Sequence, residues 1–137
     1  MLMCFVFNSY ITSQEKEIYL DINTSSECQK LQSKIIKNSI IELFGENKFN
    51  FYCENKIKIK LFLSIDTIGK IIDIRHYDYV NIDSVEFINL ITYIQTNKRF
   101  YICNIGEYPI EKKRFFEIFN YKFNISVIFN GENFIKK

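Results

Sequence analysis

The stretch Ile57–Val80, IKIKLFLSIDTIGKIIDIRHYDYV, decides the fold of this chain. Its first part places apolar residues at every second position, which is the period of a strand with one buried face. Asp66–Lys70 interrupts this pattern with turn residues, among which Gly69 can take a positive φ. A second β-rich run follows at once. The stretch therefore predicts a β-hairpin with strands at Lys56–Ile65 and Lys70–Tyr79.

The same alternation extends towards the N-terminal side of the hairpin. Phe49, Phe51 and Cys53 occupy every second position, so the period of two runs from Lys48 to Ile65. A period of two places alternate side chains on the same face of a strand. We therefore expect the chain to be extended through this whole segment.

A helix is expected before the strands, over Ser25–Phe44. Thr24 and Glu27 have the spacing of a capping box, in which the hydroxyl and the carboxylate bind free amides of the first turn. Gly45 follows the last apolar residue and can adopt the positive φ that often ends a helix. Apolar residues recur at intervals of three and four and give one buried stripe: Leu31, Ile35, Ile36, Ile40, Leu43 and Phe44.

A second helix is expected after the hairpin, over Ser84–Thr96. Asp83 is a favourable N-cap residue and stands three positions before Glu86. The apolar residues that follow fall on one helical face: Phe87, Ile88, Ile91 and Ile94. This face should pack against the apolar face of the hairpin.

The remaining segments are shorter. Glu17–Ile22 and Arg99–Ile105 have the composition of strands. Gly106–Pro109 breaks the second of these, and Ile110–Phe119 is expected to form a short helix. Tyr121–Phe129 alternates again and should close the domain with a strand.

These elements predict a single α+β domain. A chain of 137 residues suits one hydrophobic core, and we place the domain at residues 15–137. The order helix, hairpin, helix, strand predicts a small antiparallel sheet, made of the hairpin and the C-terminal strand, with two helices packed on one face. The side chains expected in the core include Ile35, Ile59, Leu61, Ile91 and Ile125.

The charge distribution does not favour nucleic acid as a partner. The formal net charge is only +2 and the two signs are interspersed, whereas phosphate binding calls for a basic patch. Lysines and aromatic residues do mix near the first hairpin strand, a pattern known from single-strand nucleic-acid platforms: Lys56, Lys58 and Lys60 with Tyr52 and Phe62. A solvated strand face that discourages aggregation is the better interpretation.

The four cysteines are scattered: Cys4, Cys28, Cys53 and Cys103. They lack the C-x-x-C spacing and the neighbouring histidines of a zinc site. The simplest interpretation is that they are buried apolar residues. In an exported protein, two of the last three could instead form a disulfide, and the sequence does not choose the pair.

The first residues resemble the end of a secretory signal peptide. Met1–Phe7 is apolar and is followed by polar residues up to Gln14, although a basic n-region and an A-x-A site are absent. We interpret residues 1–14 as a signal-peptide remnant, which predicts a periplasmic or secreted protein. The alternative is an ordinary first β-strand of a cytoplasmic protein. No stretch approaches the roughly 20 apolar residues of a membrane span, so we expect no transmembrane span.

No residue pattern indicates catalysis, a cofactor or a metal. His76 is the only histidine, and beside it Asp78 merely shares a strand face, with no nucleophile placed by a local motif. The glycines are too far apart to form a phosphate-binding loop. Asp66, Asp73, Asp78 and Asp83 lack the spacing of a calcium loop, and we interpret them as turn, edge and cap residues. We therefore expect that the protein is not an enzyme.

The hairpin and the order of elements resemble the TonB carboxyl-terminal domain family. Ser64–Ile74 reads SIDTIGKIIDI, and the family has a similar turn followed by Gly-Lys-Val-x-Asp-Ile. The helix at Ser84–Thr96 and the strand at Tyr121–Phe129 fill the places of the family's next elements, so the likeness spans roughly Leu31 to Phe129. The resemblance implies a free-standing periplasmic relative, without a membrane anchor or Pro-rich spacer, that binds partner peptides along a sheet edge.

The final strand is the candidate binding site. Tyr121–Phe129 alternates, carries little charge and contains no proline. As an edge strand it would offer free backbone groups to an extended peptide or to a second copy of the chain. We expect Tyr121, Asn124 and Ser126 to lie near the contact. The alternative interpretations are a structural subunit of a larger cell-envelope assembly and a small enzyme whose site is assembled from distant residues.

Overall fold

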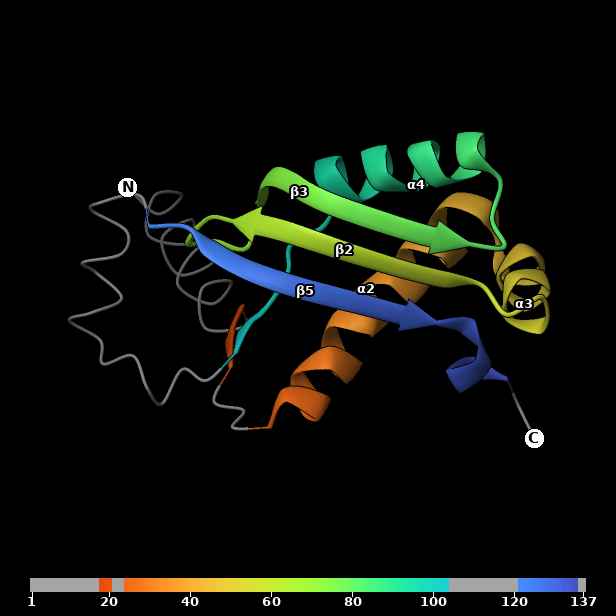
Figure 1. The fold of residues 1–137 in the computed structure, drawn as a ribbon, viewed down its shortest axis with the longest axis horizontal. Helices are drawn as coiled ribbons and strands as arrows, with labels where there is room; N and C mark the ends of the chain where they lie inside the picture. Colours follow the sequence, from red (N-terminus) through yellow and green to blue (C-terminus); the bar gives the residue numbers. More distant parts are fainter. Residues whose placement is uncertain (1–17, 21–23, 104–120, 136–137) are drawn as a thin grey trace, which may run out of the picture.

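A computed structural model describes residues 18–20, 24–103 and 121–135 and shows an α+β fold (Figure 1). In chain order the elements are β1 (Tyr19–Leu20), α2 (Ser25–Phe44), α3 (Glu46–Glu54), β2 (Lys58–Ile65), β3 (Ile71–Val80), α4 (Ser84–Asn97), β4 (Ile102–Cys103), β5 (Phe123–Asn130) and the 3-10 helix η2 (Gly131–Phe134).

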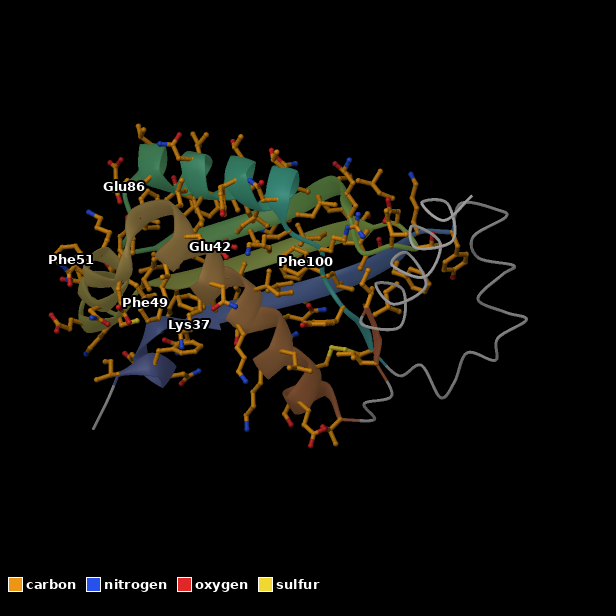
Figure 2. All side chains as sticks on the ribbon, turned by 180° about the vertical axis from the view of Figure 1, so that it is seen from behind. Lys37, Glu42, Phe49, Phe51, Glu86 and Phe100 are labelled. Atoms are coloured by element: carbon orange, nitrogen blue, oxygen red, sulfur yellow. A yellow bond between two sulfur atoms is a disulfide. The ribbon has the colours of Figure 1, made fainter. Side chains whose placement is uncertain are left out.

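The three long strands form one antiparallel sheet in the order β3–β2–β5. β2 and β3 are the expected hairpin, and β5 pairs with the other side of β2. Both α2 and α4 lie on one face of this sheet, which Figure 2 shows from behind. β1 and β4 form a separate parallel pair. The predicted fold class, a small antiparallel sheet with two helices on one face, is confirmed.

The hairpin turn has the chemistry that its sequence indicates. The Asp66 carboxylate accepts hydrogen bonds from the backbone amides of Ile68 at 3.0 Å and Lys70 at 2.9 Å. Gly69 has a φ of +81°, a conformation that side chains with a Cβ rarely adopt. A Cβ at this position would also collide with the carbonyl oxygen of Phe100. The turn therefore requires glycine for two independent reasons.

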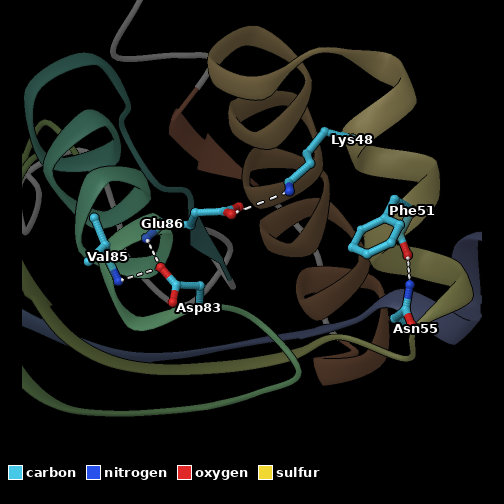
Figure 3. Close-up of polar contacts among 6 residues, drawn as sticks. All are labelled: Lys48, Phe51, Asn55, Asp83, Val85 and Glu86. Atoms are coloured by element: carbon cyan, nitrogen blue, oxygen red, sulfur yellow. Dashed lines mark hydrogen bonds and ion pairs between the residues drawn. The ribbon is translucent and has the colours of Figure 1, made fainter.

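Both long helices begin and end where the sequence indicates. The Thr24 hydroxyl accepts a hydrogen bond from the Glu27 amide at 3.4 Å, and Gly45 ends α2 with a φ of +94°. The Asp83 carboxylate accepts from the amides two and three residues later, at 3.1 and 3.4 Å (Figure 3). These caps satisfy amides that have no partner inside the helix.

The core lies between the helices and the inner face of the sheet. Of the five residues expected there, Ile59 and Leu61 are each only 1% exposed. Ile35, Ile91 and Ile125 are partly buried and pack against the core from its margin. The prediction of a fully interior position is therefore confirmed for the two β2 residues and too strong for the other three.

The segment before β2 is helical, so the prediction of a strand from Lys48 onwards is wrong. Phe49, Tyr52 and Cys53 are 5%, 2% and 3% exposed and lie on the buried side of α3. Phe51, which the alternation grouped with the buried residues, is 53% exposed. The same apolar residues satisfy both a period of two and helical spacing, and packing against the core selects the helix.

Polar contacts connect α3 to the loop and helix that follow the hairpin (Figure 3). The Lys48 ammonium lies 3.3 Å from the Glu86 carboxylate. The Asn55 side chain donates to the Phe51 carbonyl at 2.7 Å, and the Asn81 side chain donates to the Asn55 carbonyl at 2.9 Å. The Lys48 and Asn81 contacts hold α3 to the segment that follows β3, and the Asn55–Phe51 contact lies within the end of α3.

The other expected elements are shorter or lie outside the described residues. β1 and β4 each cover two residues of the strands expected at Glu17–Ile22 and Arg99–Ile105. β5 begins two residues later than the strand expected at Tyr121–Phe129 and extends one residue beyond it. The helix expected at Ile110–Phe119 and the N-terminal residues 1–14 lie outside the described part of the chain.

One disulfide joins Cys28, in the first turns of α2, to Cys103 in β4. The structure thereby selects one of the pairs that the sequence left open, and the simpler interpretation as buried apolar residues is wrong for these two cysteines. Cys53 is free and buried, as the simplest interpretation expected, and burial raises the pKa of its thiol. Cys4 lies outside the described residues.

Candidate functional site

β5 is an edge strand, and within the described residues it pairs only with β2. Successive residues of an antiparallel strand direct their backbone groups alternately to the two sides. The Ser126 carbonyl and the Ile128 amide bind a side chain outside the sheet. The backbone groups of Asn124, Ser126, Ile128 and Asn130 therefore face outward, and those of the odd-numbered residues face β2.

The side chain that binds the edge is Gln29 of α2. Its Nε2 donates to the Ser126 carbonyl at 2.8 Å, and its Oε1 accepts from the Ile128 amide at 3.3 Å. In a parallel sheet, one residue of a neighbouring strand binds the carbonyl of residue i and the amide of residue i+2 in the same way. The Gln29 amide thus takes the place of one residue of an added strand. Figure 1 shows how α2 crosses behind β5 and projects beyond its edge.

The outward groups of β5 form three such positions. We define an edge pair as the carbonyl of residue i together with the amide of residue i+2. The first consists of the Asn124 carbonyl and the Ser126 amide, the middle one is bound by Gln29, and the third consists of the Ile128 carbonyl and the Asn130 amide. The first and third edge pairs therefore lie on opposite sides of the Gln29 side chain.

Each of these two positions adjoins a hollow in the surface. Beside the first edge pair the hollow has a volume of about 430 Å³ and is lined by Thr24, Cys28, Gln29, Gln32, Tyr101, Ile102, Cys103 and residues 121–126. Beside the third edge pair the hollow has a volume of about 610 Å³ and is lined by Ser26, Gln29, Lys30, Ser33, Lys34, Ile128, Asn130, Asn133 and Phe134. Gln29 belongs to both linings and separates the two hollows.

The three residues expected at the contact all line the smaller hollow. Tyr121 precedes β5, and its ring lies edge-on to that of Phe123 with 5.1 Å between the centroids. The Asn124 side chain accepts a hydrogen bond from the Ser64 hydroxyl at 2.8 Å. Ser126 is exposed and contributes its backbone to the first and middle edge pairs. Asn124 and Ser126 thus lie on the edge strand itself, and Tyr121 lies two residues before its first residue.

Sequence reasoning missed the two glutamines of α2. Gln32, one turn after Gln29, is only 1% exposed. Its side-chain amide donates to the Tyr101 carbonyl at 2.8 Å and accepts from the Tyr101 amide at 3.0 Å. Gln29 stands beside Lys30, and Gln32 stands beside Ser33. Each has the pattern of a solvated helix residue, so no local signal distinguishes these two from surface polar residues. Only the tertiary arrangement brings their amides to the backbone of extended segments.

The other edge of the sheet, β3, is less suited to accept a partner strand. Its exposed residues include Asp73, Arg75 and Asp78. Its pairing with β2 shifts register twice, between Phe62 and Leu63 and again two residues later. Charges and bulges at an edge discourage the addition of strands. β5, with the sequence FNISVIFN, carries no charge and pairs with β2 without a shift.

The residues considered for nucleic-acid binding do not form one surface. Lys58 and Lys60 are exposed on β2, but Lys56 lies in the preceding turn with a φ of +60°. Tyr52 is buried in α3, whereas Phe62 is 37% exposed. The interpretation of Lys56 and Tyr52 as parts of the strand face is therefore wrong, because the strand begins only at Lys58.

The residues considered for catalysis or metal binding serve other contacts. His76 is exposed on β3, where its ring lies 5.7 Å from that of Phe62. Asp66 binds the turn and Asp83 caps α4, and Asp73 and Asp78 are exposed on β3. Across the part of the chain that the structure describes, no three His, Cys, Asp or Glu side chains gather in a way that could hold a metal ion.

Comparisons with family models, curated proteins and solved structures found no match. The resemblance to the TonB carboxyl-terminal domain family stays a prediction. Among the described residues, no helix has the length and apolar character needed to cross a membrane.

Proposed function

We propose that this protein is a non-enzymatic binding module that adds an extended segment of a partner protein, or of a second copy of itself, to the edge of β5. The observation that carries this proposal is the Gln29 amide, which binds the Ser126 carbonyl and the Ile128 amide from outside the sheet. A group that mimics one strand residue already occupies this edge, so its backbone geometry suits strand addition. The resemblance to a family that binds peptides along a sheet edge points the same way.

The first edge pair is where we expect the partner's backbone to bind. The Asn124 carbonyl and the Ser126 amide face outward there, beside the hollow of about 430 Å³. Backbone hydrogen bonds would supply affinity, and a partner side chain that enters the hollow would supply selectivity. Tyr121 and Lys122, which line the same hollow, would contact the partner's side chains.

Replacing Ser126 with proline tests this proposal. Proline removes the outward amide of the first edge pair and leaves the hydrogen bonds to β2 intact, which edge strands tolerate. Ser126 is a better position than Asn124, because replacing Asn124 would also remove the hydrogen bond that its side chain accepts from the Ser64 hydroxyl. Ser126→Ala is the matched control, since it removes the hydroxyl and keeps the amide.

Binding would be measured by fluorescence anisotropy with a labelled peptide of alternating serine and valine, and self-association by sedimentation velocity. We expect Ser126→Pro to weaken peptide binding or dimerisation about fivefold, in line with the loss of one hydrogen bond, and Ser126→Ala to change little. If Ser126→Pro stays folded by circular dichroism and binds as the wild type does, strand addition at β5 is wrong.

The proposed location is the periplasm or the extracellular space. The Cys28–Cys103 disulfide supports it, because disulfides persist in oxidising compartments and are rare in the cytosol. Mass spectrometry of the protein from its native cells is the test. We expect a chain that lacks the first residues, up to about Gln14, in the exported fraction. An intact Met1 in the cytosolic fraction would contradict this location.

A further inference from the structure

The larger hollow beside β5 is a groove with an apolar floor and a helical wall. Its volume is about 610 Å³, and it lies between α2 and the C-terminal half of β5. Ile128 is 46% exposed, and Phe134 of η2 contributes the other large apolar side chain. In Figure 1, the first half of α2 and η2 both lie beyond the outer edge of β5, on the side away from β2. Val127 and Phe129 are the buried residues of this part of β5, so the Ile128 side chain lies on the sheet face away from α2, whereas Phe134 stacks on Phe129 on the helix side. An extended segment along β5 can therefore place alternate side chains against Ile128 and beside α2.

The backbone of β5 offers the third edge pair to this groove. By the alternation of the strand, the Ile128 carbonyl and the Asn130 amide face outward, as the Ser126 carbonyl and the Ile128 amide do towards Gln29. The third edge pair is thus equivalent in geometry to the one that already binds a side-chain amide. A partner segment in the groove would bind it with one residue of its own backbone.

The wall of the groove is positively charged. Lys30 and Lys34 of α2, both exposed, lie one turn apart and line it. One turn further along α2, the Lys37 ammonium lies 5.5 Å from the centroid of the Phe134 ring (Figure 2). Among the described residues, none of those that line the groove is Asp or Glu. Glu27 and Glu132 are the exposed carboxylates nearest in sequence to the residues that line the groove, and neither is part of the lining.

We infer that this groove binds an acidic extended segment of a partner protein. Its backbone takes the third edge pair, its apolar side chains cover Ile128 on the sheet face away from α2, and its carboxylates face Lys30 and Lys34 on the helix side. This inference rests on the proposed function, because it assigns the partner's chemistry and a second stretch of the same edge. Opposite charges across such a contact raise selectivity and the rate of association.

Gln29 determines how long a segment can bind. A segment confined to the groove leaves the Gln29 amide on the middle edge pair. A segment that continues to the first edge pair must displace this amide and replace its two hydrogen bonds with its own backbone groups. Because the contact is partly exposed, its two hydrogen bonds contribute little net stability. A partner that binds all three edge pairs therefore gains more contacts than it removes.

The test uses the full chain and labelled peptides of equal length that alternate valine with glutamate, serine or lysine. Fluorescence anisotropy should rank the affinities glutamate, then serine, then lysine. Lys30→Gln with Lys34→Gln should weaken binding of the glutamate peptide about fivefold, the effect of two exposed ion pairs. Lys70→Gln with Arg75→Gln is the matched control, since both basic residues are exposed, neither lines the groove, and Arg75 lies on β3 at the other edge of the sheet. The control should change binding less than about twofold, as expected for distant screened charges.

The outcomes separate this inference from the proposed function. If the control weakens the glutamate peptide as much as the groove variant does, net charge and not the groove explains the preference, and the inference is overturned. Equal binding of the three peptides, all weakened by Ser126→Pro, overturns the acidic preference but supports strand addition. A glutamate peptide with N-methylated backbone amides that binds as well as the parent would overturn strand addition itself. If no peptide binds, both proposals fail.

Discussion

Removing the Cys28–Cys103 disulfide by Cys28→Ser with Cys103→Ser should cost much of the stability of this domain. The cross-link joins residues 75 positions apart and encloses α2, α3, the hairpin and α4. In the chain-entropy model, a closed loop of this length raises the free energy of the unfolded chain by about 4 kcal/mol at 25 °C. Domains of this size have a total free energy of unfolding of about 5–15 kcal/mol. The variant should therefore keep only about 1–11 kcal/mol of this free energy.

Urea denaturation measures this loss. With an m-value of about 2 kcal/mol per molar urea, a loss of about 4 kcal/mol lowers the midpoint by about 2 M. The wild type in a reducing agent should show the same shift as the double variant. Cys53→Ala is the control, because it removes a buried thiol that forms no cross-link. Its midpoint should still fall by about 2 M in a reducing agent, since its Cys28–Cys103 disulfide is intact.

Two results would refute this reasoning. One is a wild-type midpoint that a reducing agent leaves unchanged. The other is a count of four reactive thiols in the oxidised protein after denaturation, because the chain has four cysteines in all and only Cys4 and Cys53 should remain outside the disulfide. Either result would also remove the main structural support for an oxidising compartment.

Three further predictions concern the turn, an ion pair and the edge. Gly69→Ala should destabilise the fold by about 1 kcal/mol more than Gly45→Ala. Both positions have positive φ, but only a Cβ at Gly69 meets the Phe100 backbone. Thermal unfolding of the two variants measures the difference. Hydrogen bonds from Lys98, the larger effect, and from Tyr93 lower the pKa of Glu42, so its contribution is present above its usual pKa and is lost as the pH falls through the lowered value. Glu42→Gln should therefore cost less than about 1 kcal/mol near pH 7 and nothing in acid, and an equal cost at both pH values would contradict this. Gln29→Ala should free the middle edge pair and raise self-association or peptide affinity in sedimentation and anisotropy experiments, with a stability loss of about 1 kcal/mol; unchanged binding would show that the glutamine does not restrict the edge.

The parts of the fold that the sequence predicts well are those fixed by local chemistry. The Asp66 turn, the Asp83 cap and the Thr24 cap depend on residues within four positions of each other. The first strand of the hairpin follows because alternation over eight residues fits no helix, and the second follows from its β-rich composition after the turn. Local chemistry is less decisive for α3, where Phe49 and Cys53 fit either period, and the choice depends on which neighbours the segment meets in the folded protein.

The candidate site could be predicted only in part for the same reason. The composition of β5 indicates an uncharged strand, so Asn124 and Ser126 could be proposed from the sequence on the condition that this strand lies at a sheet edge. The role of Gln29 depends on contacts with residues 97 and 99 positions away, and that of Gln32 on a contact 69 positions away. The pairing of Cys28 with Cys103 likewise depends on how α2 and β4 meet in space.

The contact between Gln29 and β5 explains how an uncharged edge strand can lie at the protein surface. Natural edge strands are commonly protected by charges, prolines or bulges, and β5 has none of these along its eight residues. Gln29 instead binds the middle edge pair. An incoming strand can then bind only the first and third edge pairs, which are separated and too few for indiscriminate strand pairing. The protection consists of two partly exposed hydrogen bonds and is therefore easy to displace. Under the proposed function, a partner whose side chains also fit the hollow at the first edge pair or the basic groove at the third would gain the contacts needed to replace Gln29, while an arbitrary strand would not. The same side chain would then prevent aggregation and select the partner.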